Sequence, residues 1–330
     1  MNFTTITLQA SVDRFAEVER LRLGEVCDSR LRGLAPAGKG VNAARALRAL
    51  TRGNVRAVAW VGPESRDFFI RRLTAERLQP VLAFRRNPTR ECLTLYERAS
   101  GREVHLREQT PPVGRAEAAA FLKLLRGLNL HDDLVAVCGS APPGLPRAML
   151  KRILSTLRRR SKLLITDTNG LFLAVASRCG IGGIKGNARE IGAWLKLDAP
   201  WSVARAAHRR ALLARLASAS PRRPPSAGGP PCAALVTLGA HGAILASGGQ
   251  LWLARPPPLA RRAIRSAVGC GDAATAGWLW ALAQDASPAE AVRRAVACGT
   301  AKLLQADPGR LDARDVRRLL ERTGVVRVPL

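Results

Sequence analysis

The chain has 330 residues, of which 47% are hydrophobic and only 4% aromatic, and its formal net charge is +28. This length supports one large α/β domain or two smaller ones, with a core built mainly from Leu, Ala and Val. No apolar run reaches the roughly 18 residues that a membrane helix needs, and the first residues lack the basic and apolar regions of a signal peptide. We therefore expect no membrane partner.

The cysteines and the basic residues indicate the compartment and the kind of ligand. Seven cysteines, without a CxxC pair, favour reduced thiols in the cytoplasm over a disulfide framework or a zinc site. Lysine and arginine are spread along the whole chain, and a single tyrosine leaves little for base stacking. Specific nucleic-acid binding therefore stays a minor alternative, and the charge mainly supports attraction of anionic metabolites.

The N-terminal part of the chain predicts a strand over residues 5–8, with Asp13 just beyond its end. Ligand contacts in α/β sheets occur at such strand ends. Residues 17–34 are too polar for a pair of core strands and indicate an exposed β-flap. A glycine loop at residues 37–40 then leads into a helix, and residues 55–61 form a buried strand.

Strands and helices alternate along the rest of the chain. A hairpin is predicted over residues 91–108, with its turn at 99–101. Proline, glycine and serine crowd residues 218–231 and predict a surface loop. The further elements that we expect are helices over 116–128, 146–158, 272–284 and 288–304, and strands over 134–138, 162–166, 183–185, 234–237 and 243–245. This order predicts a mostly parallel sheet with helices on both faces.

The segment from Gly269 to Asp272 carries the strongest chemical signal. A Gly-x-Gly loop that opens a helix leaves backbone N–H groups directed at one point, which suits an anion. Asp272 has two interpretations on this segment alone, a helix cap or a catalytic acid, and neither is favoured. Asn187 and Glu190 pose a similar question, because they lie on one face of a first helical turn. They can reach Mg²⁺ through water, or they form a capping box, which is the interpretation favoured locally.

Six segments, taken in chain order, resemble the signatures of one family. They are residues 38–45 (GKGVNAAR), 139–144 (GSAPPG), 167–170 (DTNG), 185–190 (KGNARE), 237–242 (TLGAHG) and 268–277 (VGCGDAATAG). Over residues 5–306 the chain resembles the PfkB (ribokinase-like) carbohydrate kinases. Within them it is similar to the hexose-phosphate branch, which contains 1-phosphofructokinase and tagatose-6-phosphate kinase.

The resemblance implies a fold and an assembly. It implies a ribokinase-like three-layer α/β/α sandwich with a mostly parallel central sheet, formed by residues 1–330 as a single kinase domain. A small β-sheet lid would come from segments near 14–35 and 91–108. Such a lid excludes water from the site and often pairs two subunits, so a homodimer is implied as well.

The resemblance also implies roles for individual residues. Asp272 would be the general base, and the backbone of Gly269, Cys270, Gly271 and Asp272 would form an anion hole. Arg90 would bind the phosphate that the substrate already carries, a task suited to a guanidinium. The other implied acceptor contacts are Asp13, Gly38, Lys39, Asn42 and Ser140. The implied ATP contacts are Lys185, Asn187, Glu190, Thr237, Leu238, Gly239, Ala240, His241 and Gly242, with Asn187 and Glu190 serving Mg²⁺ through water.

The implied reaction is ATP- and Mg²⁺-dependent phosphorylation of a ketohexose phosphate to the bisphosphate. Fructose 1-phosphate, tagatose 6-phosphate and fructose 6-phosphate are the candidate acceptors. The sequence departs from the family pattern at Gln9-Ala10, Ala37 and Gly186. These departures motivate an alternative, a catalytically impaired member that binds a sugar phosphate or nucleotide as a regulator. A ribokinase- or nucleoside-type kinase is a further alternative, against which Arg90 argues.

Overall fold

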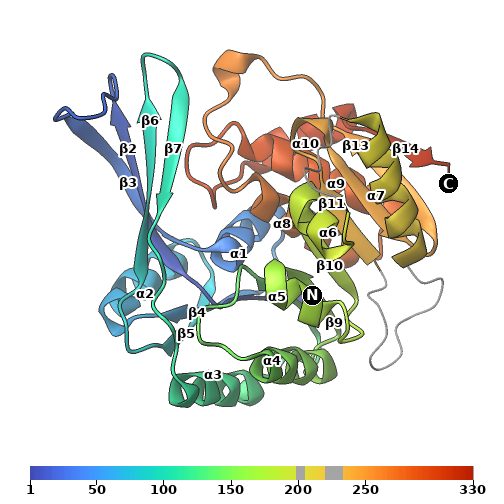
Figure 1. The fold of residues 1–330 in the computed structure, drawn as a ribbon, viewed down its shortest axis with the longest axis horizontal. Helices are drawn as coiled ribbons and strands as arrows, with labels where there is room; N and C mark the ends of the chain where they lie inside the picture. The colour runs from blue at the N-terminus through green and yellow to red at the C-terminus, as the bar shows by residue number, and fades with distance from the viewer. Residues whose placement is uncertain (198–204, 220–232, 330) are drawn as a thin grey trace.

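Two β-sheets organise the protein, whose computed structural model describes residues 1–197, 205–219 and 233–329 (Figure 1). Within these residues the large sheet has ten strands, in the order β14-β13-β12-β11-β10-β9-β8-β1-β4-β5. Neighbours from β11 to β5 are parallel, and β12 to β14 are antiparallel at one edge. Their bounds are β1 (Asn2–Thr7), β4 (Val55–Val61), β5 (Gln79–Phe84), β8 (Asp133–Cys138), β9 (Leu163–Asp167), β10 (Gly183–Asn187), β11 (Ala233–Thr237), β12 (Ala243–Ser247), β13 (Gln250–Arg255) and β14 (Gly324–Val328).

Helices cover both faces of this sheet and form two cores. Successive residues of a strand point to opposite faces, and in β4 Val55 and Ala57 join one core whereas Val58 and Trp60 join the other. The first core includes α1 (Lys39–Leu50), α2 (Arg66–Ala75), α8 (Cys270–Leu282), α9 (Pro288–Lys302) and α10 (Ala313–Arg322). The second includes α3 (Arg115–Gly127), α4 (Arg147–Arg160), α5 (Gly170–Ala176), α6 (Ala188–Trp194) and α7 (Ala206–Ala219). The expected three-layer α/β/α architecture is confirmed.

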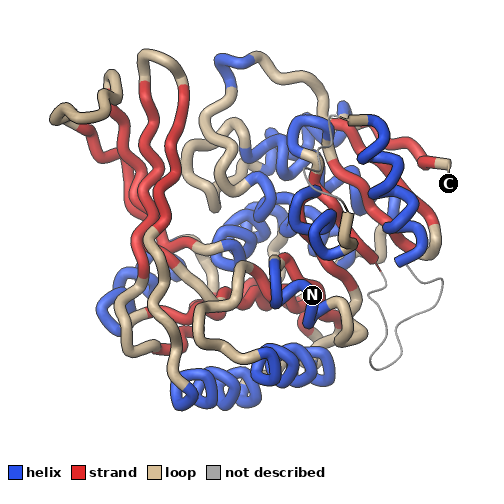
Figure 2. The backbone as a smooth tube through the Cα atoms, viewed as in Figure 1, coloured by secondary structure: helices blue, strands red, loops and turns tan. Residues whose placement is uncertain are grey.

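A separate four-stranded sheet, called the small sheet below, stands beside the large one (Figure 2). Its order is β3 (Ser29–Ala37), β2 (Ser11–Val18), β6 (Arg90–Glu97) and β7 (Arg102–Arg107). The central pair β2 and β6 is parallel, and β6 and β7 form the expected hairpin. Gly101 adopts a φ of 67° in the hairpin turn, a conformation that favours glycine.

The structure corrects the sequence interpretation of the N-terminal segment. Asp13 does follow the first strand, β1, but it lies inside a second strand, β2, opposite Cys92 of β6. The predicted flap over residues 17–34 therefore starts too late, because β2 already begins at Ser11. Polar residues such as Ser11 and Asp13 lie on one face of this strand and weaken its apolar signal.

Several elements at the periphery were not predicted, namely α2, β5, α5, α7, β13, α10 and β14. The edge strands β5 and β14 have at most one buried residue each, so their apolar pattern is weak. Of the predicted loop over residues 218–231, Ser218 and Ala219 belong to α7, and 220–231 lie outside the described residues. Among the helices of the described ranges, none has both the length and the apolar character that crossing a bilayer requires.

Candidate active site

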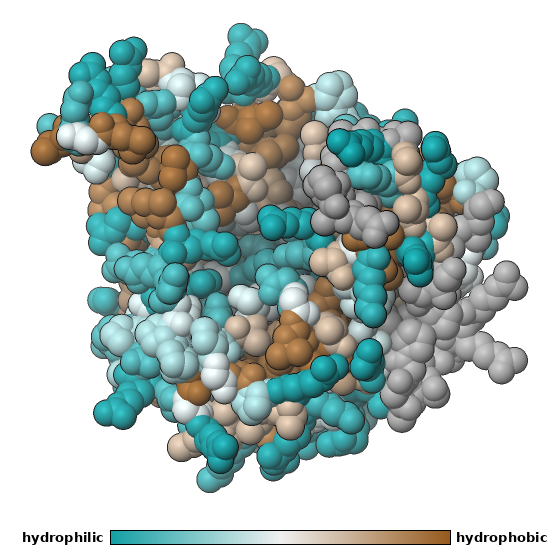
Figure 3. All heavy atoms as spheres, in the orientation of Figure 1, coloured by the Kyte–Doolittle hydropathy of each residue, from teal (hydrophilic) through white to brown (hydrophobic). Residues whose placement is uncertain are grey.

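A cleft of about 360 Å³ lies between the small sheet and the carboxyl ends of the central strands. Hydrophilic residues surround the hollow between the two sheets in Figure 3. The cleft is lined by Ser11, Asp13, Gly38, Lys39, Asn42, Arg90, Cys92, His105, Arg107, Lys185, Asn187, Glu190, Thr237, Val268, Gly269, Gly271 and Asp272. Most of the residues that the sequence singled out are therefore brought together, although they come from both ends of the chain.

The first glycine loop brings the start of α1 to the cleft. Gly38 has a φ of 112°, and a Cβ there would lie 2.7 Å from Thr7 Cγ2 and 3.0 Å from the carbonyl oxygen of Gln9. Only glycine fits this position, because the backbone conformation and the space both exclude a side chain. The turn directs Lys39 and Asn42 of α1 toward α8.

The second glycine loop tests the helix-cap interpretation of Asp272. The N-cap of α8 is Gly269, in the left-handed conformation with φ 87°, and the helix has no side-chain cap. Asp272 is the third residue of the helix, so the cap interpretation is wrong. Its Oδ2 instead accepts a hydrogen bond of 2.9 Å from Asn42 Nδ2. The first turn of α8 thus presents N–H groups without intrahelical partners beside a carboxyl group.

Asp272 has an unusual electrostatic environment. Burial and the neighbouring carboxylate of Asp167 raise its pKa to about 6, against the opposing effect of Lys39, Lys185 and the Asn42 hydrogen bond. The side chain is therefore a carboxylate at neutral pH that binds a proton more readily than an ordinary aspartate. Such a shift suits a general base.

Asp167, at the end of β9, is the centre of a buried ion network that sequence reasoning did not assign. Lys185 Nζ donates to its Oδ2 at 2.8 Å and Lys39 Nζ to its Oδ1 at 3.1 Å, and Thr275 Oγ1 adds a 2.9 Å bond. Burial opposes ionisation of Asp167, but the two ammonium groups prevail and lower its pKa to about 2. The network fixes both lysines at the floor of the cleft, with Lys185 packed against Gly271.

The opposite end of the cleft is rich in cations from the small sheet. Arg90 begins β6, and His105 and Arg107 alternate on β7, so both face the cleft. Within the described residues, the buried Nε of Arg90 and Oδ1 of Asn42 lack hydrogen-bond partners. Unpaired buried polar atoms are costly unless a ligand satisfies them. His105 and Arg107 were missed from the sequence, where only their alternation with Val104 and Leu106 could have indicated a shared face.

Asn187 and Glu190 do form a capping box at the start of α6. Asn187 Oδ1 accepts from the Glu190 N–H at 2.9 Å, and Glu190 Oε2 accepts from the Asn187 N–H at 2.8 Å. Both residues nevertheless line the cleft, and Glu190 Oε1 lies 3.6 Å from Lys39 Nζ. Asn187 and Glu190 can therefore cap α6 and still contact a ligand in the cleft.

Some residues singled out from the sequence lie outside the lining of the cleft. Ser140 donates to Gln9 Oε1 at 3.2 Å in the neighbouring loop. Thr237 lines the cleft, but the turn after it, Leu238 to Gly242, lies beyond it, with residues 239–241 exposed. Cys270 also lies outside the lining, and burial raises the pKa of its thiol to about 11. The Cys270 N–H donates to the carbonyl oxygen of Ala267 at 3.4 Å.

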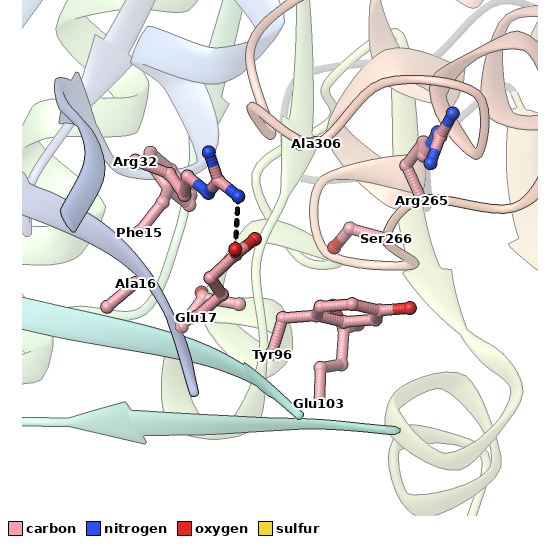
Figure 4. A pocket seen from close by; sticks show the side chains of 10 residues that line it. Phe15, Ala16, Glu17, Arg32, Tyr96, Glu103, Arg265, Ser266 and Ala306 are labelled. Carbon is pink, nitrogen blue, oxygen red and sulfur yellow. Dashed lines mark hydrogen bonds and ion pairs between the residues drawn. The ribbon is translucent and has the colours of Figure 1, made fainter. Parts of the chain in front are cut away.

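A second cavity of about 250 Å³ opens under the small sheet, next to the cleft. Figure 4 shows the Glu17–Arg32 pair and Tyr96 on one side and Arg265 and Ser266 on the other. Glu103 of β7 bridges the gap, because its Oε1 accepts a 3.2 Å hydrogen bond from the N–H of Ala267. The small sheet is thus in direct contact with the loop that leads into α8.

Comparison with known proteins identifies the family. The sequence profile described as "pfkB family carbohydrate kinase" matches residues 9–312, which is most of the chain. The chain belongs to this family.

Individual relatives of this pfkB-family chain are distant. The 1-phosphofructokinase of Bacillus subtilis (strain 168) is 27% identical over 190 residues, which cover 57% of this chain and 60% of that protein. Escherichia coli phosphofructokinase-2, crystallised in complex with potassium, has a TM-score of 0.85 at 22% identity, over 97% of this chain and 98% of that one. A possible 1-phosphofructokinase from Thermotoga maritima has a TM-score of 0.81 at 17% identity over 100% of both chains. The structural matches confirm the ribokinase-like fold.

Proposed function

We propose that the chain is a single kinase domain that transfers the γ-phosphoryl group of ATP to a hydroxyl of a ketohexose phosphate, yielding a bisphosphate. The observation that carries the proposal is Asp272, a buried carboxyl of raised pKa on the first turn of α8. Beside it are the N–H groups of that turn and the ammonium groups of Lys39 and Lys185. A base and an anion-binding turn at one point are what phosphoryl transfer to an alcohol requires.

The mechanism follows from this arrangement. The acceptor oxygen attacks the γ-phosphorus and passes its proton to Asp272, while the bond from phosphorus to the bridging oxygen of ADP breaks. Asn42 holds Oδ2 of Asp272, so Oδ1 is the oxygen that takes the proton. The N–H groups from Gly269 to Asp272 and the ammonium of Lys185 stabilise the charge on the transferring group. Transfer then depends mainly on positioning and electrostatics.

The cationic end of the cleft supports a phosphorylated acceptor. Arg90, with its unpaired Nε, would bind the phosphate, and Arg107 and His105 add positive potential on the same side. Asp13 and Asn42 would hold sugar hydroxyls between this phosphate and Asp272. Fructose 1-phosphate, tagatose 6-phosphate and fructose 6-phosphate all carry a phosphate and a distant primary hydroxyl, and the names of the relatives agree with such substrates.

The nucleotide would lie against Lys185, Asn187, Glu190 and Thr237, with the 238–242 turn outside the cleft as a contact for the more distant parts of ATP. Within the described ranges no group of three or more His, Cys, Asp or Glu side chains is placed to hold a metal ion, so Mg²⁺ would be held mainly by the nucleotide phosphates and water. Asn187 and Glu190 would hold it through water. When bound, Mg²⁺ neutralises charge on the nucleotide phosphates.

A panel of acceptors in a coupled ADP-release assay tests the proposal. Turnover with at least one of the three ketohexose phosphates, at a higher kcat/KM than with neutral fructose or ribose, is expected. ADP release with none of them, combined with sugar-phosphate binding in calorimetry, would instead support the regulator. The departures at Gln9, Ala37 and Gly186 give that alternative little support, because these residues do not belong to the lining of the cleft.

Replacing Arg90 by alanine is expected to raise KM for the preferred sugar phosphate by about 10- to 100-fold, because hydrogen bonds to a charged group contribute about 1.5–3 kcal/mol. KM for a neutral sugar should change little. Arg102→Ala, at an exposed position on β7, is the matched control and should leave both values unchanged. Equal effects of Arg90→Ala on the two kinds of sugar would remove Arg90 from the phosphate site.

For the assembly we propose a homodimer through the outer face of the small sheet, which would act as a lid over the cleft. Cross-strand partners share a face of a sheet, and Leu93–Leu106 and Leu95–Val104 are such pairs on the face opposite the cleft. Leu106 is 56% exposed, and hydrophobic residues gather at this end of the molecule in Figure 3. A second copy of the chain would cover this exposed apolar face. Sedimentation tests this by measuring the mass of the assembly, and the mass of a dimer is expected.

A further inference from the structure

The loop that leads into the anion-binding turn is held by the end of α9. The N–H of Arg265 donates to the carbonyl of Leu303 at 2.7 Å. Gly269 fits so closely that a Cβ there would lie 2.2 Å from the carbonyl oxygen of Pro308. Residues 265–269 thus lie directly on the segment from 302 to 308, and the direction of the N–H groups at the start of α8 depends on this contact.

Lys302, the last residue of α9, is fully buried at this contact. Its Nζ donates to the carbonyl oxygen of Gln305 at 2.8 Å and to that of Ser266 at 3.4 Å. Within the described residues its ammonium has no ion pair with a carboxylate. Lys185, the other lysine buried to this degree, differs because it is paired with Asp167 at 2.8 Å.

The surroundings of Lys302 favour a cation although they contain no ion-pair partner. An ammonium has three donors and no acceptor, which suits two carbonyl oxygens. The carboxyl end of α9 carries the negative end of the helix dipole. Burial lowers the pKa of Lys302, and the groups that oppose this are the Cys270 thiol and the carboxyls of Asp307, Glu103 and Asp272. A buried charge without a carboxylate partner stabilises a fold poorly. A role in the candidate active site therefore explains Lys302 better than a role in stability.

We propose that Lys302 is a positioning residue, a fixed cation built into the chain that holds the Ser266 carbonyl and thereby the anion-binding turn at Gly269–Gly271. Lys302 does not line the cleft, so it would not contact a substrate bound there. It acts through the loop, and its charge lies behind the turn where the phosphoryl group would be bound. The effect on turnover rests on the proposed kinase function, whereas the effect on the loop does not.

Kinetics and hydrogen–deuterium exchange of three proteins test this role. Lys302→Met removes the charge at nearly constant volume, and Cys298→Ala is the matched control, a buried change on the same helix. Lys302→Met is expected to lower kcat by on the order of 10- to 100-fold, since loss of an oxyanion donor itself costs about 10²–10³-fold. KM for the sugar phosphate should stay within a few-fold. In Lys302→Met, hydrogen–deuterium exchange should rise in peptides that cover residues 265–271. Cys298→Ala should change neither kcat nor exchange.

Rescue of a variant by added cations distinguishes a positioning role of Lys302 from a merely structural one. Lys302→Ala leaves a space lined by carbonyl oxygens, so ammonium or potassium ions should restore part of kcat and of the exchange protection, while tetramethylammonium should not. The wild type should not respond to these ions. Near-wild-type kcat and unchanged exchange in Lys302→Met would overturn the proposal, as would rescue by tetramethylammonium.

Two further outcomes are separable. If the wild type phosphorylates no sugar phosphate, the proposed function fails, and the exchange data alone decide the role of Lys302. If Lys302→Met and Lys302→Ala do not fold, the wild type is studied at rising pH. Loss of the ammonium proton should then lower kcat and raise exchange in residues 265–271. Lys302→Arg should remove this alkaline limb, because a guanidinium stays charged, and a limb that persists in Lys302→Arg would contradict the proposal.

Discussion

Asp272→Asn is expected to lower kcat by on the order of 10³–10⁴-fold while the affinity for ATP changes little. The asparagine keeps the size of the side chain and the contact with Asn42, but it cannot accept a proton from the acceptor hydroxyl, a step that contributes about 10²–10⁴-fold in enzymes. Steady-state ADP release and calorimetric ATP titration measure the two effects. Asp285→Asn, just beyond α8, is the control, because Asp285 has a φ of 48° that asparagine tolerates well.

The pH dependence sharpens the same experiment. Because burial and Asp167 raise the pKa of Asp272 to about 6, kcat/KM of the wild type should fall as the pH drops below about 6. The folded state binds this proton more tightly than the unfolded chain, so ionised Asp272 costs stability above pH 6. Asp272→Asn should therefore be as stable as the wild type at neutral pH, or more so. A near-wild-type kcat, or a large loss of stability with inactivity, would contradict the role of base.

The residues of this candidate site could be predicted from the sequence wherever a local conformation required a residue type. Gly38 and Gly269 have positive φ angles and no space for a Cβ, and both were assigned to ligand loops from their setting alone. Asp272 was identified with them, although helix cap and catalytic acid could not be separated. The backbone excludes the cap, because it makes Gly269 the N-cap of α8. The role of Asp272 as base stays a prediction.

The parts that the sequence did not reveal depend on contacts between distant segments. Asp167 is the last residue of an ordinary buried strand, and its importance comes from Lys39 and Lys185, which are 128 and 18 residues away along the chain. Arg107 reaches the cleft because β7 pairs with β6 in the register Cys92–Arg107. Lys302 has the same origin, since its partner Ser266 is 36 residues away. Periodicity reveals which face of an element is buried, but not which side chain lies opposite.

Asp167→Asn is expected to give the second large effect, a loss of stability, because it breaks the ion network around Asp167. The substitution removes the negative charge between Lys39 and Lys185, which leaves the ammonium group of Lys185 buried and that of Lys39 partly buried without this carboxylate. Removal of one partner from a buried ion pair costs about 3–5 kcal/mol, so the free energy of unfolding at neutral pH should fall by that order. Denaturant unfolding measures it. Asp133→Asn is the control, because within the described residues Asp133 has a single ion pair, at 3.1 Å with the partly exposed Arg56, beside a hydrogen bond from Thr4 Oγ1, and a smaller loss is expected.

Two pH effects distinguish this network from general damage to the fold. The Asp167 pKa is lowered to about 2, so its contribution to stability is present above the unfolded value of 3.8 and is lost as the pH falls toward 2. The difference between wild type and Asp167→Asn should shrink over the same range. The variant also removes a charge that raises the pKa of Asp272 and frees two ammonium groups that lower it. The acid limb of kcat/KM should therefore move to lower pH, and a limb that stays near pH 6 would show that Asp167 does not act on the base.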